Sequence, residues 1–194
     1  MTTTEWKKFL SSWNEILISK IEYEPLSMDE LIASDMLNNK ILSNRWLGYP
    51  GATENSIKAI EQKIGMVLPP SYRNFLLISD GFRQPGNLVP KLLSIKNIDW
   101  YRVNHQETID IWNDESNEIL TDDPDAFSQY LQDALQISAE EYGGSAVYLL
   151  NPKVITDNGE WEALYFASWI PGADRYPSFW DLMQNELKVL GGDD

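Results

Sequence analysis

Two short amphipathic helices separated by a fixed break constrain the fold of this chain more than any other feature. Residues 46–82 read WLGYPGATENSIKAIEQKIGMVLPPSYRNFLLISDGF. Thr53 can cap the first helix, whose isoleucines recur at helical spacing, and Gly65 stands where a left-handed residue commonly ends a helix. Pro69 and Pro70 then open the second helix, because a proline in the first helical turn loses no backbone hydrogen bond. All of these residues predict architecture, and none of them is a candidate for catalysis.

This stretch resembles the start of the SUKH superfamily, which includes fungal cell-wall-assembly regulators and many bacterial immunity proteins. The matching residues of the first half are Leu47, Gly48, Glu61, Leu68, Pro69, Tyr72, Phe75, Leu76 and Gly81. The family usually has asparagine before that last glycine, and this chain has Asp80, which tolerates the same turn conformations. Four later segments are also similar to one branch of the family, namely residues 134–138, 147–152, 159–163 and 168–180, with Trp161, Trp169, Phe179 and Trp180 among them.

The order of the expected elements predicts an α+β fold. We expect an amphipathic helix beginning near Thr4, a second helix opened by the capping box from Ser27 to Glu30, and the two helices described above. The later expected elements are a strand over 88–95, helical turns within 98–112, a helix over 127–137, strand segments at 147–150 and 154–155, a hairpin turn at 157–159, a strand over 161–169 and a closing helix from 178. Runs of helices and strands that do not alternate regularly are typical of this class.

The chain is predicted to form one domain over residues 1–194. Residues 1–45 are expected to be an N-terminal helical extension, and residues 46–187 the family-like core. The resemblance implies a mostly antiparallel sheet flanked by helices, with the closing helix at the C-terminal end.

Composition narrows the classes of function. The chain has 194 residues, 43% of them hydrophobic, with no cysteine and a net charge of −15. The missing cysteines exclude disulfides, thiolate metal sites and thiol nucleophiles. The N-terminal stretch has neither a signal-peptide pattern nor a membrane span, so we expect a cytoplasmic protein. The negative charge disfavours binding to nucleic acid or to a membrane and favours a basic partner.

The sequence contains few candidates for catalytic or metal-binding groups. His105 is the only histidine, which excludes a zinc site with two histidines and leaves one candidate for a serine–histidine pair. Gly143 and Gly144 lack the lysine that a phosphate-binding loop requires. The acids from Asp122 to Asp125 lack the spacing of a calcium loop. We therefore expect no catalytic residue, no cofactor and no metal.

Charge distribution offers the strongest functional signal. The fifty residues from Val103 to Pro152 contain eleven acidic residues and neither lysine nor arginine. A concentrated field of one sign speeds the encounter with an oppositely charged partner. The candidate partner-binding residues are Glu107, Asp110, Asp114, Glu115, Glu118, Asp122, Asp123 and Asp125. The remaining alternative for this segment is an acidic surface that only keeps the protein in solution.

Three functions are compatible with these observations. The resemblance and the acidic segment together favour an immunity protein, which would bind the basic groove of a cognate polymorphic or contact-dependent toxin, such as a nuclease, and block it without chemistry. A regulatory scaffold, as the fungal relatives imply, is the first alternative. A carbohydrate-binding protein or enzyme built on tryptophans and carboxylates is the second, although Trp46, Trp161, Trp169 and Trp180 fall in the family-like segments and are expected in the core.

Overall fold

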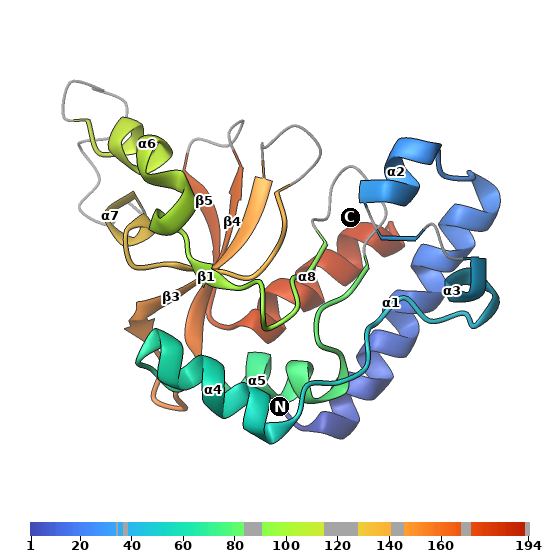
Figure 1. Ribbon diagram of the computed structural model, residues 1–194, viewed down its shortest axis with the longest axis horizontal. Helices are drawn as coiled ribbons and strands as arrows, with labels where there is room; N and C mark the ends of the chain where they lie inside the picture. The colour runs from blue at the N-terminus through green and yellow to red at the C-terminus, as the bar shows by residue number, and fades with distance from the viewer. Residues whose placement is uncertain are drawn as a thin grey trace.

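A computed structural model of the chain describes residues 1–33, 35–36, 39–83, 91–114, 128–140, 146–167 and 172–192 (Figure 1). Its centre is a five-stranded antiparallel sheet in which the strands follow one another in chain order. The strands are β1 (Asp99–Trp100), β2 (Leu135–Gln136), β3 (Ala146–Ile155), β4 (Trp161–Ala167) and β5 (Ala173–Tyr176). The sheet and its helices confirm the predicted α+β class.

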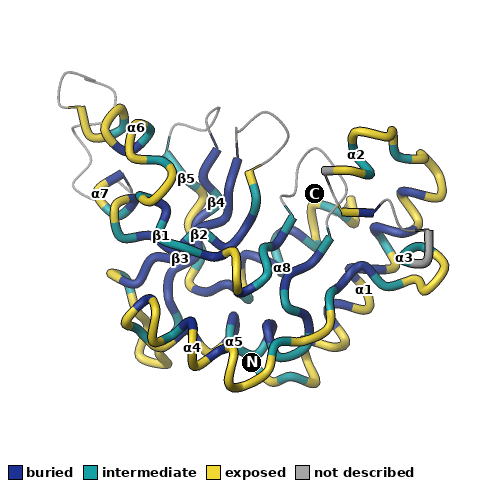
Figure 2. The backbone as a smooth tube through the Cα atoms, in the orientation of Figure 1, coloured by how far each residue is buried: buried dark blue, intermediate teal, exposed yellow. Residues whose placement is uncertain are grey.

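The long hairpin of β3 and β4 forms the middle of this sheet and is buried on both faces (Figure 2). Its turn uses Gly159 at φ 77°, and the Thr156 amide donates to the Glu160 carbonyl at 2.9 Å. A glycine at positive φ is what a tight hairpin turn requires, so the predicted turn at residues 157–159 is confirmed. Because successive side chains of a strand alternate between faces, Tyr148 and Leu150 join one core cluster while Val147 and Leu149 join the other.

Helices cover the two faces of the sheet unequally. The larger core cluster contains side chains of α1 (Thr3–Tyr23), α4 (Glu54–Ile64), α5 (Pro70–Ile78) and α8 (Phe179–Gly191). The smaller cluster lies under α6 (Arg102–Trp112) and α7 (Ser128–Leu131). Two short helices, α2 (Met28–Ala33) and α3 (Asn39–Ser43), connect α1 to the rest of the chain. The protein thus has a thick helical layer on one side of the sheet and a thin one on the other.

The break between α4 and α5 forms as the sequence predicts. Thr53 accepts a hydrogen bond from the Ser56 amide at 3.1 Å, and Gly65 ends α4 in the left-handed conformation. Pro70 is the first residue of α5. The Glu61 carboxylate holds the intervening loop by accepting from the Leu68 amide at 3.1 Å.

The residues that carry the family resemblance are architectural. Those that are buried are Leu68, Pro69, Tyr72, Phe75, Leu76, Gly81, Trp161 and Phe179, whereas Trp180 is half-buried. Trp169 lies outside the described residues. The buried side chains of α5 and α8 meet the aromatic residues of α1, so the first helix belongs to the same core as the family-like segment.

Two expected elements differ from the structure. The helix expected over 127–137 is wrong in its second half, because α7 ends at Leu131 and residues 135–136 form β2 between β1 and β3. The strand expected over 88–95 lies outside the described residues up to position 90. Beyond it, Leu92 forms only isolated bridges to Phe82 and Ser138. Those bridges place residues 91–97 beside the end of α5.

Candidate functional site

Three of the five described acids of the acidic segment lie on α6 or just after its end. Glu107 and Asp110 are exposed on α6 and Asp114 is exposed two residues after the helix ends, while Ile109 is 1% exposed and packs into the smaller core cluster. Residues three and four positions apart lie on the same side of a helix, so Glu107 and Asp110 share one face. The other predicted partner-binding residues, Glu115, Glu118, Asp122, Asp123 and Asp125, lie outside the described residues.

Two aliphatic side chains accompany these acids. Val103 is 58% exposed and Ile111 is 57% exposed, both on α6. Exposed aliphatic residues amid charge are common where a protein surface contacts a partner, because a desolvated apolar centre surrounded by polar groups is the usual anatomy of an interface. The charge pattern of the sequence marks only the acids of this segment and not these two aliphatic residues. We call the five residues Val103, Glu107, Asp110, Ile111 and Asp114 the α6 face.

Another acid of the segment, Asp133, pairs with cations just outside the borders of the segment. Asp133 lies 3.6 Å from Arg102 and 3.0 Å from Lys153, measured between charged atoms. These two cations flank the stretch that lacks lysine and arginine. Glu140 lies 3.1 Å from Nδ1 of His105. The other three described acids of the segment, Glu107, Asp110 and Asp114, are exposed and belong to the α6 face.

His105 has a structural role near the start of α6. It interrupts α6 with non-helical angles of φ −131° and ψ 30°, and its ring stacks on Tyr101 at 4.3 Å. Burial raises the pKa of the Tyr101 hydroxyl to about 12, so this ring remains neutral at physiological pH. The stacked pair fixes the start of α6 on the sheet.

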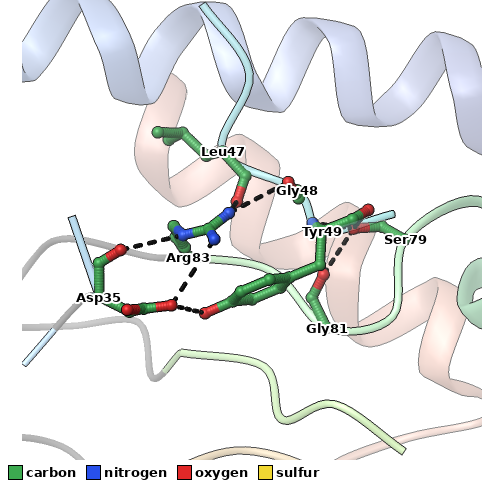
Figure 3. Close-up of polar contacts among 7 residues, drawn as sticks. All are labelled: Asp35, Leu47, Gly48, Tyr49, Ser79, Gly81 and Arg83. Carbon is green, nitrogen blue, oxygen red and sulfur yellow. Dashed lines mark hydrogen bonds and ion pairs between the residues drawn. The ribbon is translucent and has the colours of Figure 1, made fainter. Parts of the chain in front are cut away.

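A second polar cluster joins the N-terminal helices to the family-like core (Figure 3). The Arg83 side chain donates to the carbonyls of Asp35 at 3.0 Å, Leu47 at 3.3 Å and Gly48 at 3.2 Å. Its guanidinium lies 3.7 Å from the centre of the Tyr49 ring, and the Tyr49 hydroxyl donates to the Asp35 carboxylate at 2.8 Å. Burial and the hydrogen bond to Asp35 raise the pKa of Tyr49 well above its ordinary value, so the hydroxyl remains a donor. We call Asp35, Tyr49 and Arg83 the arginine clamp.

A surface hollow of about 460 Å³ lies beside this clamp. Its lining residues are Asp35, Tyr49, Pro50, Asp80, Lys91, Leu92, Leu93, Ser94, Lys96 and Asn97. The Asp80 carboxylate accepts from the Ile95 amide at 2.6 Å, so it fixes one wall. The Ser94 hydroxyl is buried without a hydrogen-bond partner. The hollow offers charges of both signs but, in the described part of the chain, no paired nucleophile and base. Sequence reasoning missed it because its residues come from four separate segments without a common spacing.

The clamp yields a prediction for stability. Replacing Arg83 with methionine is expected to lower the free energy of unfolding by about 2 kcal/mol, because partly buried carbonyls lose the hydrogen bonds that the guanidinium donates. The matched control is Lys96→Met, an exposed cation on the same hollow that is expected to change stability by less than about 0.5 kcal/mol. Urea denaturation of both variants measures the difference, and equal stabilities would show that the clamp contributes nothing.

Across the described ranges, no group of three or more histidine, cysteine, aspartate or glutamate residues is arranged to hold a metal ion. None of the described helices combines the length and the apolar character that a membrane crossing needs.

Comparison with known proteins assigns the fold to a family. The sequence profile of the SMI1 / KNR4 family (SUKH-1) matches residues 51–185, which is well over half of the chain. No curated protein matches the chain significantly. The matched range contains the break between α4 and α5, the whole sheet and the α6 face. The chain belongs to the SMI1 / KNR4 family (SUKH-1).

Proposed function

We propose that this chain is a non-catalytic protein-binding module, and that it is an immunity protein that neutralises a cognate toxin by binding a basic surface of that toxin. The observation that carries the proposal is the α6 face, where exposed carboxylates and exposed aliphatic side chains lie together. Membership in the family supports the protein-binding role. The same proposal places the protein in the cytoplasm of the cell that makes the toxin.

Electrostatics gives the proposed mode of action its physical basis. The net charge of −15 draws a cationic protein toward the chain, and the α6 face presents three exposed carboxylates of that charge. Such steering raises association rates above those of neutral pairs and weakens as salt screens the charges over about 8 Å. A nuclease toxin must expose cationic groups to hold its own substrate, so an acidic helix can occupy the same groove in place of phosphates.

The aliphatic residues would act after the encounter. Charged residues at the edge of an interface mainly set the association rate, whereas residues desolvated at its centre mainly set the dissociation rate. Val103 and Ile111 would bury apolar area against the toxin, and the surrounding carboxylates would pair with its lysines or arginines. Blocking the groove in this way requires no catalytic residue.

We expect the double variant Glu107→Gln, Asp110→Asn to associate more slowly with the toxin. The test uses the toxin domain encoded beside the gene for this chain and measures association at two salt concentrations. At low salt the rate should fall by about tenfold, and the salt dependence should become shallower. A second variant, Ile111→Ser, is expected to raise the dissociation rate instead.

The matched control is the double variant Asp29→Asn, Asp157→Asn, which removes the same amount of charge from exposed positions elsewhere. It should alter the association rate far less than the α6 variant. Equal effects of the two double variants would refute docking through α6. Failure of the wild-type chain to bind or protect against any neighbouring toxin would refute the immunity role.

The carbohydrate alternative receives no support from the tryptophans. Trp6, Trp13 and Trp161 are at most 2% exposed, and the other described tryptophans are half-buried. A sugar-stacking platform needs an exposed aromatic face. The regulatory scaffold stays as the alternative, and it predicts several weak partners in place of one tight one.

A further inference from the structure

The hairpin turn between β3 and β4 carries the one asparagine of the chain that is followed by glycine, namely Asn158. Asn158 and Gly159 are both exposed, and a Cβ atom placed on Gly159 would meet no atom within 4 Å. An asparagine before glycine is the side-chain amide most prone to deamidation, because glycine leaves the next backbone nitrogen without a side chain to shield it. The turn therefore holds the most reactive amide of the chain in contact with water.

The reaction needs only groups of the turn and water. The Gly159 backbone nitrogen attacks Cγ of Asn158, a C–N bond forms, and the side-chain NH2 group takes up the proton of that nitrogen and leaves as ammonia. Water then opens the resulting cyclic imide. Hydrolysis of the new bond to Cγ gives aspartate, whereas hydrolysis of the original peptide bond gives isoaspartate and lengthens the main chain by one methylene group. Both products add one negative charge to the chain.

The folded turn slows this attack, because the attacking nitrogen is engaged in a hydrogen bond. The Gly159 amide donates to the Thr156 carbonyl at 2.9 Å, and the Glu160 amide donates to Thr156 Oγ1 at 3.1 Å. The first bond must open before the Gly159 nitrogen can reach Cγ of Asn158, and the second bond stabilises the closed turn. Since exposed turns open locally at a small cost in free energy, we expect the reaction to proceed through brief openings of the turn in the otherwise folded protein.

The residue after the turn connects this modification to the core. The Glu160 carboxylate accepts from the Ser71 amide at 2.9 Å and from the Ser71 hydroxyl at 2.7 Å. Ser71 lies in the first turn of α5 and is fully buried, and its carbonyl accepts from the Trp6 indole at 2.9 Å. Glu160 thus ties the hairpin to the start of α5. An extra backbone methylene two residues before Glu160 would move its carboxylate away from Ser71.

We propose that Asn158 is a site of spontaneous deamidation, and that its isoaspartate product loosens the contact between the β3–β4 hairpin and α5. This inference goes beyond the proposed function and stands whether or not the α6 face binds a toxin. The modification would give the folded chain a loss of stability that grows with its age and begins at the hairpin turn.

The test incubates the purified chain in mildly alkaline buffer and follows its tryptic peptides by mass spectrometry. Trypsin releases residues 154–175 as one peptide, in which Asn158 is the only asparagine. The mass of this peptide should rise by about one dalton, with isoaspartate as the main product. Residues 46–58 are the internal control, because Asn55 is exposed and precedes serine but lies inside α4. The mass of this second peptide should stay constant over the same period.

Two variants test the role of the turn and of the longer backbone. Thr156→Ala removes the hydroxyl that accepts from the Glu160 amide, so it should speed conversion by about threefold. Freshly prepared Asn158→Asp carries the added charge on an ordinary backbone, so its Ser71 amide should exchange hydrogen with solvent as slowly as in the wild type. The deamidated fraction of the wild type, separated by ion exchange, should exchange this amide about tenfold faster.

Several results would contradict the proposal. A constant mass of the peptide with Asn158, or equal conversion of Asn55, would overturn the assignment of the site. A conversion rate that Thr156→Ala leaves unchanged would contradict a reaction through opening of the turn. Wild-type exchange of the Ser71 amide in the deamidated fraction would show that the longer backbone leaves the contact between the hairpin and α5 intact.

Discussion

Replacing Trp6 with alanine is expected to lower the free energy of unfolding by about 3–5 kcal/mol, the cost of removing a large buried aromatic side chain. Trp6 is fully buried, and the centre of its ring lies 5.5 Å from Phe75 of α5, 5.4 Å from Phe179 of α8 and 4.8 Å from Trp180. Its indole nitrogen donates to the Ser71 carbonyl at 2.9 Å. The substitution would leave a cavity and would remove the hydrogen bond from the indole to that carbonyl.

Urea denaturation followed by circular dichroism measures this loss without relying on tryptophan fluorescence. Tyr23→Ala is the matched control, because Tyr23 lies on the same helix but is 92% exposed, and its loss should cost less than about 0.5 kcal/mol. If Trp6→Ala does not fold, Trp6→Phe should fold with a smaller loss. A change below about 1 kcal/mol in the alanine variant would show that α1 is an appendage and not part of the core.

This core role of α1 could be predicted only in part from the sequence. The apolar spacing of Trp6, Leu10, Trp13 and Leu17 predicts a helix with one buried side, which the structure confirms. The spacing cannot tell what covers that side. The structure places α5 and α8 against it, so residues expected to be an extension pack into the centre of the family-like fold.

Local signals were reliable where one residue determines the geometry. The caps at Thr53 and Gly65, and the turn at Gly159, formed as predicted, because each depends on a side chain or a φ angle within its own segment. The helix expected over residues 127–137 is wrong in its second half for the opposite reason. Its apolar residues fit a helical period and an alternating one, and pairing with β1 and β3, which lie elsewhere in the chain, decides between them.

The candidate sites, too, could be predicted only in part from the sequence. A helix over residues 102–112 is enough to place Glu107 and Asp110 on one side, but the sequence predicts only helical turns in this region. The pairing of Asp133 with Lys153 depends on how the chain folds back on itself. The arginine clamp also joins distant segments, and no motif in the sequence marks it.

The stability of the protein is expected to fall by about 3 kcal/mol in total as pH rises from about 4.5 to about 7, because of one buried carboxyl group. Glu186 of α8 is 7% exposed, and this burial raises the pKa of its side chain to about 7. The negative charge of Asp174 adds to the shift, and the neighbouring Tyr148 hydroxyl opposes it in part. The folded state therefore binds more protons than the unfolded state in this pH range, so raising the pH through it favours unfolding.

Glu186→Gln removes the titrating group while keeping its shape. We expect the variant and the wild type to differ little in stability near pH 5. Near pH 8 the variant should be more stable than the wild type by about 2–3 kcal/mol, because on folding at that pH only the wild type must either bury an ionised carboxylate or bind a proton. Urea denaturation of both proteins at both pH values measures the difference between their free energies of unfolding. Glu107→Gln, the same change at an exposed position, controls for the general effect of net charge and should show no such crossover. Parallel pH curves for wild type and Glu186→Gln would mean that Glu186 reaches water or a cation in the folded state.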